Sequence, residues 1–203
     1  MAEATTEVDI WNLSLAHVRA KAQVSDPAEA TKEANACRLF YTHTRRLTLS
    51  ANDWAFARQI ETLSVNAAAV THYLREYAYG YNLPNGMITP RYLYPFRSKV
   101  PFEICLAPGV DNSRMLLTNI TKPKMVFTDN VTAVTIMDEQ FISALSWHLA
   151  AYIGPKLTGN EKWYDIAMKM YRDILPSAIS HVNQNYEKDQ LADPPDAPWI
   201  TAR

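Results

Sequence analysis

The stretch DEQFISALSWHLAAYI, residues 138–153, decides the fold. One helical stripe is formed by Phe141, Leu145, His148, Leu149 and Tyr152, and Ile142 and Ala151 lie near it. A helix that is apolar around most of its circumference is typical of the centre of a bundle. Gly154-Pro155 follows at once, and this pair predicts the end of the helix.

A second helix is expected directly after the first. The stretch NEKWYDIAMKMYRDIL, residues 160–175, has apolar residues at helical spacing, and Asn160 or Thr158 provides a capping side chain. Pro176 is expected to kink or interrupt this helix, because proline removes one backbone hydrogen bond and crowds the preceding turn. The remaining sequence can continue the helix to about residue 188.

Two more helices are expected near the N-terminus. Residues 8–22 form a short helical pattern after Thr6 or Asp9, either of which can cap it. Ser25-Asp26-Pro27 predicts the start of a longer helix that continues to about residue 50, since proline is well suited to the first helical position. This longer pattern has two apolar faces, which indicates two packing neighbours.

The sequence between these helical parts has the pattern of an antiparallel sheet with small hairpins. Short runs of β-prone residues are separated by breakers, namely Pro84-Asn85-Gly86, Pro90, Pro95, Pro101, Pro108-Gly109 and Pro123. In FEICLA, the side chains of Phe102, Ile104 and Leu106 alternate to one side, which predicts a strand with one covered face.

The expected fold class is therefore α+β. We expect an antiparallel helical bundle formed by residues 8–58 and 138–188, with a small antiparallel β domain, residues 60–137, inserted between its halves. Residues 189–203 are expected to form an extended C-terminal tail.

The tail sequence DPPDAPWITAR, residues 193–203, combines three prolines with two large apolar residues. The prolines favour an extended segment that loses little entropy on binding. Pro195, Pro198, Trp199 and Ile200 are therefore candidate partner-binding residues. The alternative is a disordered end with an incidental tryptophan.

Composition argues against several functional classes. The chain has 20 Lys and Arg against 21 Asp and Glu, with a formal net charge of −1, and it lacks the basic clusters that bind nucleic acid. Cys37 and Cys105 are far apart, so they are interpreted as small buried hydrophobes of a reducing compartment. The N-terminal sequence does not resemble a signal peptide, and no apolar run is long enough to span a membrane.

The histidines do not suggest a metal or catalytic site. His148 lies on the apolar stripe of the central helix and has no partner at metal-binding spacing, so a hydrogen-bonded core residue is the favoured interpretation. His17, His43, His72 and His181 are scattered. We expect no catalytic residues, no metal and no cofactor.

Other candidate motifs have structural explanations. GPKLTGN, residues 154–160, resembles a phosphate-binding loop only in its glycines, because no Lys-Ser/Thr pair follows them. Asp129 with Asp138-Glu139 is better explained by a loop and a helix N-terminus than by a carboxylate cluster. The tyrosines of YAYGYNL, residues 77–83, lack the basic groove of a nucleic-acid platform and are expected to be half-buried in a strand.

Four stretches resemble podovirus head-to-tail adaptor proteins, the family often called tail tubular protein A. DWAFAR, residues 53–58, resembles the family's W-x-F-A-R signature, and YAYGYNLP, residues 77–84, is similar to its Tyr-x-Leu-Pro segment. RMLLTNI, residues 114–120, resembles a hairpin before the second helical half, and residues 141–160 resemble the family's second-half helix. The family often has Pro-Ala-Asp where this chain has Pro84-Asn85-Gly86.

The resemblance implies a structural virion protein and no enzyme. It implies a ring, commonly of twelve subunits, at the head–tail junction between the portal protein and a tail nozzle protein similar to tail tubular protein B. DNA passes through such a channel without sequence-specific binding, and the protein is made in the host cytoplasm without membrane contact. A closed ring of this kind needs heterologous contacts between identical subunits.

Two alternatives remain. One is a helical scaffold or interaction protein with an inserted β region. The other is a tail-associated cell-wall hydrolase, which would need two carboxylates on either side of a sugar-binding cleft. Glu61, Glu76 and Glu103 are the candidate carboxylates.

Overall fold

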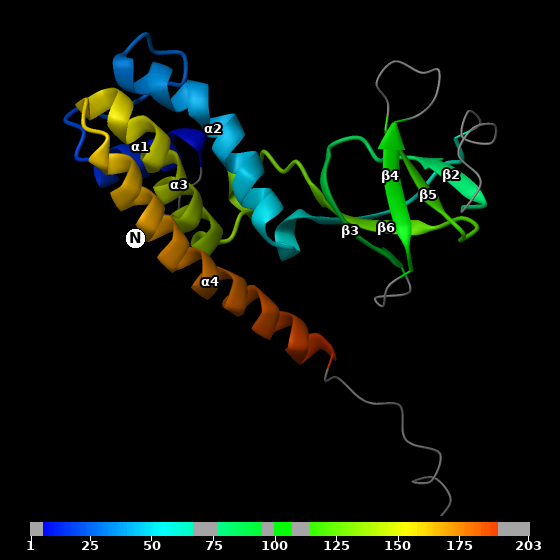
Figure 1. Cartoon of the computed structure of the whole chain (residues 1–203). Coiled ribbons are helices and arrows are strands. Elements are labelled where there is room, and N and C mark those ends of the chain that lie inside the picture. The colour runs from blue at the N-terminus through cyan, green and yellow to red at the C-terminus, as the bar shows by residue number, and fades with distance from the viewer. Residues whose placement is uncertain (1–5, 67–76, 95–99, 107–113, 191–203) are drawn as a thin grey trace, which may run out of the picture. The chain divides into compact units, whose positions relative to one another are not determined.

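The computed structural model describes residues 6–66, 77–94, 100–106 and 114–190, and the chain divides into two compact units (Figure 1). The helical unit contains Met1–Thr48 and Ala133–Arg203, and the β unit contains Leu49–Thr132. The described residues form four α-helices and six strands, so the predicted α+β fold class is confirmed. Residues 191–203 of the predicted tail lie outside the described part.

Helix α3 is the central helix of the helical unit. The four helices are α1 Glu7–His17, α2 Lys32–Ala51, α3 Glu139–Thr158 and α4 Lys162–Gln190. Helix α3 packs against both α1 and α4 (Figure 1). Its residues Phe141, Leu145 and Leu149 have no exposed surface. The predicted central helix is therefore confirmed.

Helix α1 begins at a capping box. The hydroxyl of Thr6 accepts a hydrogen bond from the backbone N–H of Asp9, and the Asp9 carboxylate accepts one from the backbone N–H of Thr6. The helix ends at His17, earlier than the expected residue 22. The backbone leaves the helix at Arg19, which has a φ of 58°.

The predicted start of the second helix at Pro27 is wrong. The Glu29 carboxylate accepts hydrogen bonds from the backbone N–H groups of Ser25 and Asp26, so these residues form a turn. Helix α2 instead begins at Lys32, where the Thr31 hydroxyl accepts a hydrogen bond from the N–H of Ala34 at 3.2 Å.

The predicted end at Gly154-Pro155 is also wrong. Helix α3 continues through both residues and ends before Gly159, whose φ of 67° is the left-handed conformation of a helix C-cap. The N–H of Gly159 donates to the carbonyl of Pro155 at 2.9 Å. Helix α4 continues through Pro176 to Gln190, so the helix is not interrupted there, and it extends about as far as the sequence allowed.

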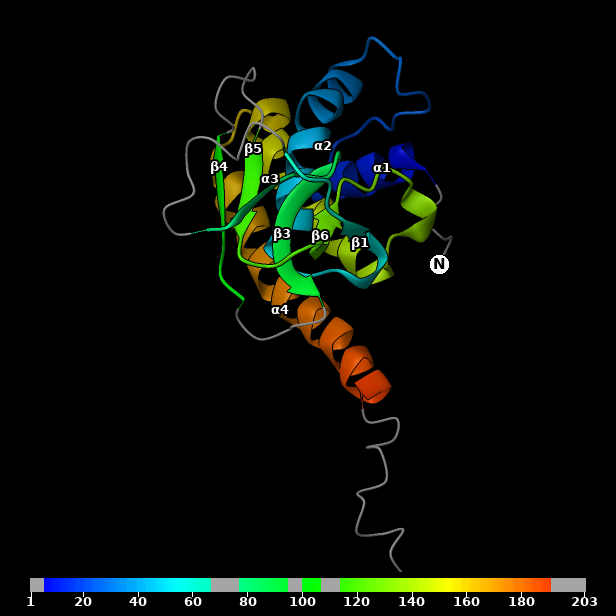
Figure 2. The same cartoon turned by 90° about the vertical axis from the view of Figure 1, so that its right-hand side faces the viewer.

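The described strands of the β unit form two antiparallel sheets of three strands each, where the sequence predicted one. One sheet has the order β1-β6-β3, formed by Arg58–Thr62, Lys124–Asp129 and Met87–Tyr94, and Figure 2 shows these three strands together. The other has the order β2-β5-β4, formed by Tyr79–Asn82, Arg114–Thr118 and Phe102–Leu106.

Pairing in these sheets differs from a series of hairpins. Among the described strands, β4 and β5 are the one pair that is consecutive along the chain, while β2 and β3 belong to different sheets despite the short Pro84-Asn85-Gly86 connection. Gly86 has a φ of 80°, and its carbonyl accepts a hydrogen bond from the N–H of Asn130. Pro90 lies inside β3, an edge strand with an irregular register, where proline is tolerated.

The core of the β unit is formed by residues from both sheets, including Tyr81, Leu116 and Met125. The Tyr81 hydroxyl donates to the carbonyl of Ile120 at 2.9 Å and accepts from the N–H of Lys122 at 3.1 Å. The expected half-burial of the tyrosines therefore does not hold for Tyr81, which is 1% exposed, whereas Tyr79 is 38% exposed.

The covered face expected for FEICLA is confirmed only in part. Phe102 and Ile104 pack against the core of the β unit. Leu106 is 60% exposed and is therefore not covered by this core.

Candidate interaction surface

The described residues contain no group of three or more His, Cys, Asp or Glu side chains placed to hold a metal ion. GPKLTGN is the C-terminal end of α3 followed by its glycine cap. A helix C-terminus exposes backbone carbonyls, which repel phosphate, whereas a phosphate-binding loop presents backbone N–H groups. GPKLTGN is therefore not suited to bind phosphate. Asp138 and Glu139 stand at the N-terminus of α3, where acidic groups complement the helix dipole.

His148 is a buried core residue, as the sequence predicted. It is 4% exposed, its Nδ1 lies 2.8 Å from the Thr48 hydroxyl, and its ring stacks on Tyr171 with centroids 4.3 Å apart. Burial, followed by the charge of His43, lowers the pKa of His148 to about 4. His148 is therefore neutral at neutral pH and acts in packing.

A serine and a histidine that the sequence did not connect are brought together by α1 and α3. Nε2 of His17 lies 3.0 Å from the hydroxyl of Ser146, and the His17 ring stacks on Trp147 with centroids 3.7 Å apart. Ser146 is only 1% exposed, and its hydroxyl donates to the carbonyl of Ser143. Because a nucleophilic serine must reach a substrate, this pair is structural.

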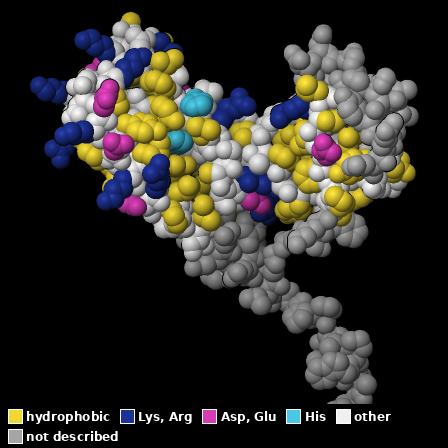
Figure 3. Space-filling model, in the orientation of Figure 1, with side chains coloured by type: hydrophobic (Ala, Val, Ile, Leu, Met, Phe, Trp, Pro, Cys, Tyr) yellow, Lys and Arg dark blue, Asp and Glu magenta, His cyan; other side chains and the backbone are white. Residues whose placement is uncertain are grey.

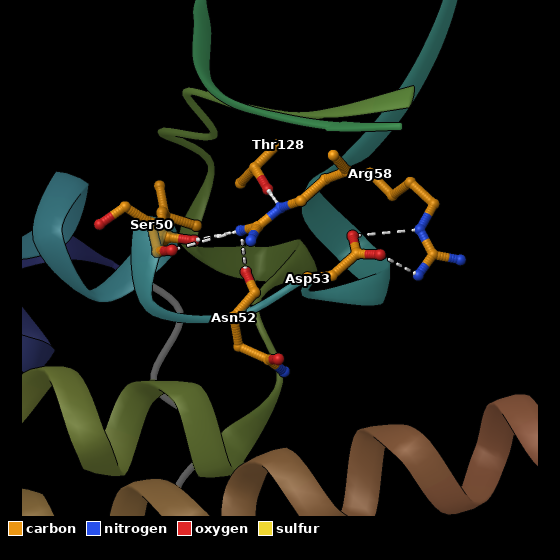
Figure 4. Close-up of polar contacts among 7 residues, drawn as sticks. Ser50, Asn52, Asp53, Arg58 and Thr128 are labelled. Carbon is orange, nitrogen blue, oxygen red and sulfur yellow. Dashed lines mark hydrogen bonds and ion pairs between the residues drawn. The ribbon is translucent and has the colours of Figure 1, made fainter. Parts of the chain in front are cut away.

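A polar cluster surrounds Arg91 of the β unit, and Figure 4 shows its contacts. The Arg91 guanidinium donates to the Thr128 hydroxyl at 2.8 Å and to the backbone carbonyls of Leu49, Ser50 and Asn52. Leu49 and Ser50 belong to the last turn of α2, and Asn52 follows the helix. Burial lowers the pKa of Arg91.

Beside this cluster, DWAFAR forms a compact bend between α2 and β1. The Arg58 guanidinium donates two hydrogen bonds to the Asp53 carboxylate, at 2.6 and 3.2 Å (Figure 4). Trp54 is fully buried, and Ala55–Ala57 forms a single 3-10 turn. Trp54 therefore anchors the bend in the core, while Phe56 is only half-buried.

The helical unit has a cluster of rings at its surface, which we call the aromatic patch: Phe40 and His43 of α2, Tyr152 of α3 and Tyr164 of α4. Tyr152 is its centre. Ring centroids of His43 and Tyr164 each lie 6.0 Å from that of Tyr152, at interplanar angles of 89° and 88°. Two rings from different helices therefore stand at right angles to Tyr152.

The aromatic patch is accessible to a partner. His43 is exposed, Tyr164 is 40% exposed, and Phe40 and Tyr152 are half-buried. Nearby in the α2 sequence, Leu39 and Leu47 are 59% and 39% exposed, and each is four positions from His43 on the same helical face. Figure 3 shows hydrophobic side chains gathered on this face of the unit with histidine among them.

The sequence contained only part of the signal for this patch. Phe40 and Tyr152 belong to apolar stripes that the helical periodicity identifies. Which rings meet depends on how α2, α3 and α4 pack, and the periodicity of one helix does not specify its neighbour. The patch is therefore a result of tertiary structure.

The predicted partner-binding residues Pro195, Pro198, Trp199 and Ile200 lie outside the described residues, as do Glu76 and His72. Glu61 and Glu103 are exposed and lie on different sheets of the β unit. Cys37 is buried, and burial raises its pKa to about 12, whereas Cys105 is half-buried.

No protein-family model matches this chain, and no curated protein is significantly similar to it in sequence. None of the helices in the described residues combines the length and the hydrophobicity needed to cross a membrane.

Proposed function

We propose that this chain is a structural virion protein, a head-to-tail adaptor that forms a ring between the portal and the tail nozzle of a phage. The observation that carries the proposal is where the four family-like stretches lie. DWAFAR joins α2 to β1, YAYGYNLP contains β2, RMLLTNI contains β5, and residues 141–160 cover most of α3. Each stretch thus has a structural position that agrees with an inserted β unit between two helical halves.

Side chains of these stretches have structural roles. Trp54 is fully buried, and Asp53 and Arg58 pair across the bend that leads into the β unit. Tyr81 is hydrogen-bonded inside the β core, and Leu116 of β5 belongs to the same core. The motifs therefore maintain the fold, which suits a protein whose work is to present surfaces.

A ring of identical subunits requires two different complementary surfaces on each subunit, because the contact is heterologous. The aromatic patch is suited to be one of them, since exposed aromatic residues are enriched at protein interfaces. Portal and nozzle would occupy other surfaces of the subunit. DNA would pass through the channel without sequence-specific contacts, in agreement with the near-neutral net charge of −1.

The test is electron microscopy of the purified chain mixed with the portal of the same virion. We expect a collar, with twelve-fold symmetry if the family's usual number holds, on portal particles, and mass measurement should find monomers or weak association in the chain alone. A stable small dimer that portal leaves unchanged would contradict the proposal. It would favour the alternative of a scaffold protein with another partner.

A further inference from the structure

We propose that the aromatic patch of one copy binds the C-terminal tail, residues 191–203, of a neighbouring copy. The proposal combines the ring geometry around Tyr152 with the sequence of the tail and with the place where α4 ends. It rests on the proposed function and deepens it by naming one contact that would join adjacent subunits. It requires neither portal nor nozzle, so it can fail independently of that function.

The chemistry of the tail suits the aromatic patch. Proline-rich segments are preorganised and bind to surfaces lined by aromatic rings, where proline rings lie against aromatic faces. The tail has Pro194, Pro195 and Pro198, followed by Trp199 and Ile200. On the patch, two rings stand at right angles to Tyr152, and the Lys156 ammonium lies 5.5 Å from the Phe40 ring centroid.

The length of α4 indicates that the bound tail comes from another copy. From Tyr164 to Gln190 the helix is about 39 Å long, at about 1.5 Å per residue. The chain from Gln190 to Trp199 reaches at most about 32 Å when fully extended. If the chain turned back along its own α4, the backbone of Trp199 would therefore not reach Tyr164. The Tyr164 ring is more distant still, because helical side chains point toward the N-terminus of the helix and thus away from Gln190.

If the backbone of Trp199 falls short of the patch of its own chain, then Trp199 and the patch are both available to other copies. The donor segment and the acceptor patch are different surfaces, so the contact is heterologous and joins copies head to tail. A weak contact of this kind becomes effective when several copies are held together, because binding then depends on the local concentration of tails. A contact of this kind is what the proposed function requires, because we expect weak association in solution and a ring only on portal.

The experiment uses the full chain with Trp199 replaced by photoreactive p-benzoylphenylalanine, which keeps an aromatic side chain at that position. After irradiation at high protein concentration without portal, we expect cross-links between chains, on peptides that contain Phe40, Tyr152 or Tyr164. Their yield should rise with protein concentration. Cross-links only within a chain, only to the β unit, or none at all would overturn the proposal.

Matched variants test whether the patch itself is responsible. Tyr164→Ser should reduce the yield about tenfold, as expected for loss of a central aromatic contact, while Tyr164→Phe should retain it. Tyr79→Ser is the control, because Tyr79 of the β unit is 38% exposed and Tyr164 is 40% exposed. Circular dichroism should show that all three variants are folded, and an equal loss in Tyr79→Ser and Tyr164→Ser would overturn the proposal.

Discussion

At the scale of single residues, Gly154 allows α3 and α4 to pack closely. A Cβ atom added at Gly154 would lie 2.9 Å from Cβ of Trp163 and 3.2 Å from Cγ1 of Val18. The first distance is to an atom near the backbone of α4, which cannot move away as a flexible side-chain end could. Glycine is therefore required here by the space between elements, and its backbone remains helical.

We predict that Gly154→Ala destabilises the protein. Alanine is favoured over glycine in a helix by up to about 1 kcal/mol, but forcing a methyl group into a packed site costs about 1–3 kcal/mol. Urea unfolding should therefore show a lower midpoint with an unchanged slope. Thr42→Ala, at an exposed position of α2, is the control and should leave the midpoint unchanged or slightly higher. A higher midpoint for Gly154→Ala would contradict the packing argument.

Gly154 also explains why the predicted end of α3 was wrong. Glycine and proline in succession predict the end of a helix when only local sequence is considered. Here the glycine fits against Trp163, a residue of another element, and the helix is capped only by Gly159, where the left-handed conformation favours glycine. Gly154 is thus required by close packing and Gly159 by its backbone conformation. The sequence alone does not distinguish these two requirements.

At the scale of elements, Arg91 completes the C-terminus of α2. Its guanidinium is shared among three backbone carbonyls and the Thr128 hydroxyl, so one side chain satisfies several acceptors. Such multiple donation depends on the planar fork of arginine, which a lysine ammonium does not reproduce.

We predict that Arg91→Met lowers the free energy of unfolding by about 2 kcal/mol, because it removes the hydrogen bonds that the guanidinium donates to Thr128 and to the three carbonyls. Arg58→Met is the matched control. Its ion pair with Asp53 is partly exposed, at 19% and 27% for the two side chains, and such pairs contribute about 0–1 kcal/mol. Chemical denaturation of both variants measures the difference. Equal losses would show that Arg91 has no special role at the helix end.

The elements themselves were largely predictable from the sequence, but their partners were not. The apolar stripe of residues 138–153 identified the central helix because burial on most sides leaves a periodic signal. The predicted start of α2 was too early because the Glu29 carboxylate accepts hydrogen bonds from the backbone N–H groups of Ser25 and Asp26. These bonds hold the segment in a turn, and helix propensities do not take them into account. The Pro84-Asn85-Gly86 turn indicated a hairpin, yet β2 and β3 pair with strands much later in the chain.

At the scale of the whole molecule, two histidines of the helical unit make stability depend on pH. Burial lowers the pKa of both His17 and His148 to about 4, compared with an ordinary value of 6.5. Between these values the unfolded chain binds protons that the folded chain does not. Their contribution to stability is therefore fully present above pH 6.5 and is lost as the pH falls toward 4.

We predict that the free energy of unfolding decreases between pH 7 and pH 5, by up to about 2 kcal/mol for His148. His17 is only half-buried, and solvent screening reduces its share to about 1 kcal/mol or less. Urea titrations at several pH values in this window measure the slope, and the lower limit of pH 5 avoids most carboxylate titration. In the variant His148→Gln, the free energy of unfolding should depend less steeply on pH than in the unmodified protein. A stability that stays constant over this range would show that neither histidine remains neutral in the folded protein.

The pairing of β1 with β6 also determines when the chain can fold during synthesis. Arg58 is opposite Thr128 in the register, so among the described strands β1 pairs with a strand that is made about 60 residues later. Helix α1 likewise packs on α3, which begins only at Glu139. Neither core can close early, because contacts between distant residues delay folding. The ribosome therefore carries an open chain, in which the apolar strands of the β unit are uncovered until β6 has been made and α1 waits until α3 has been made.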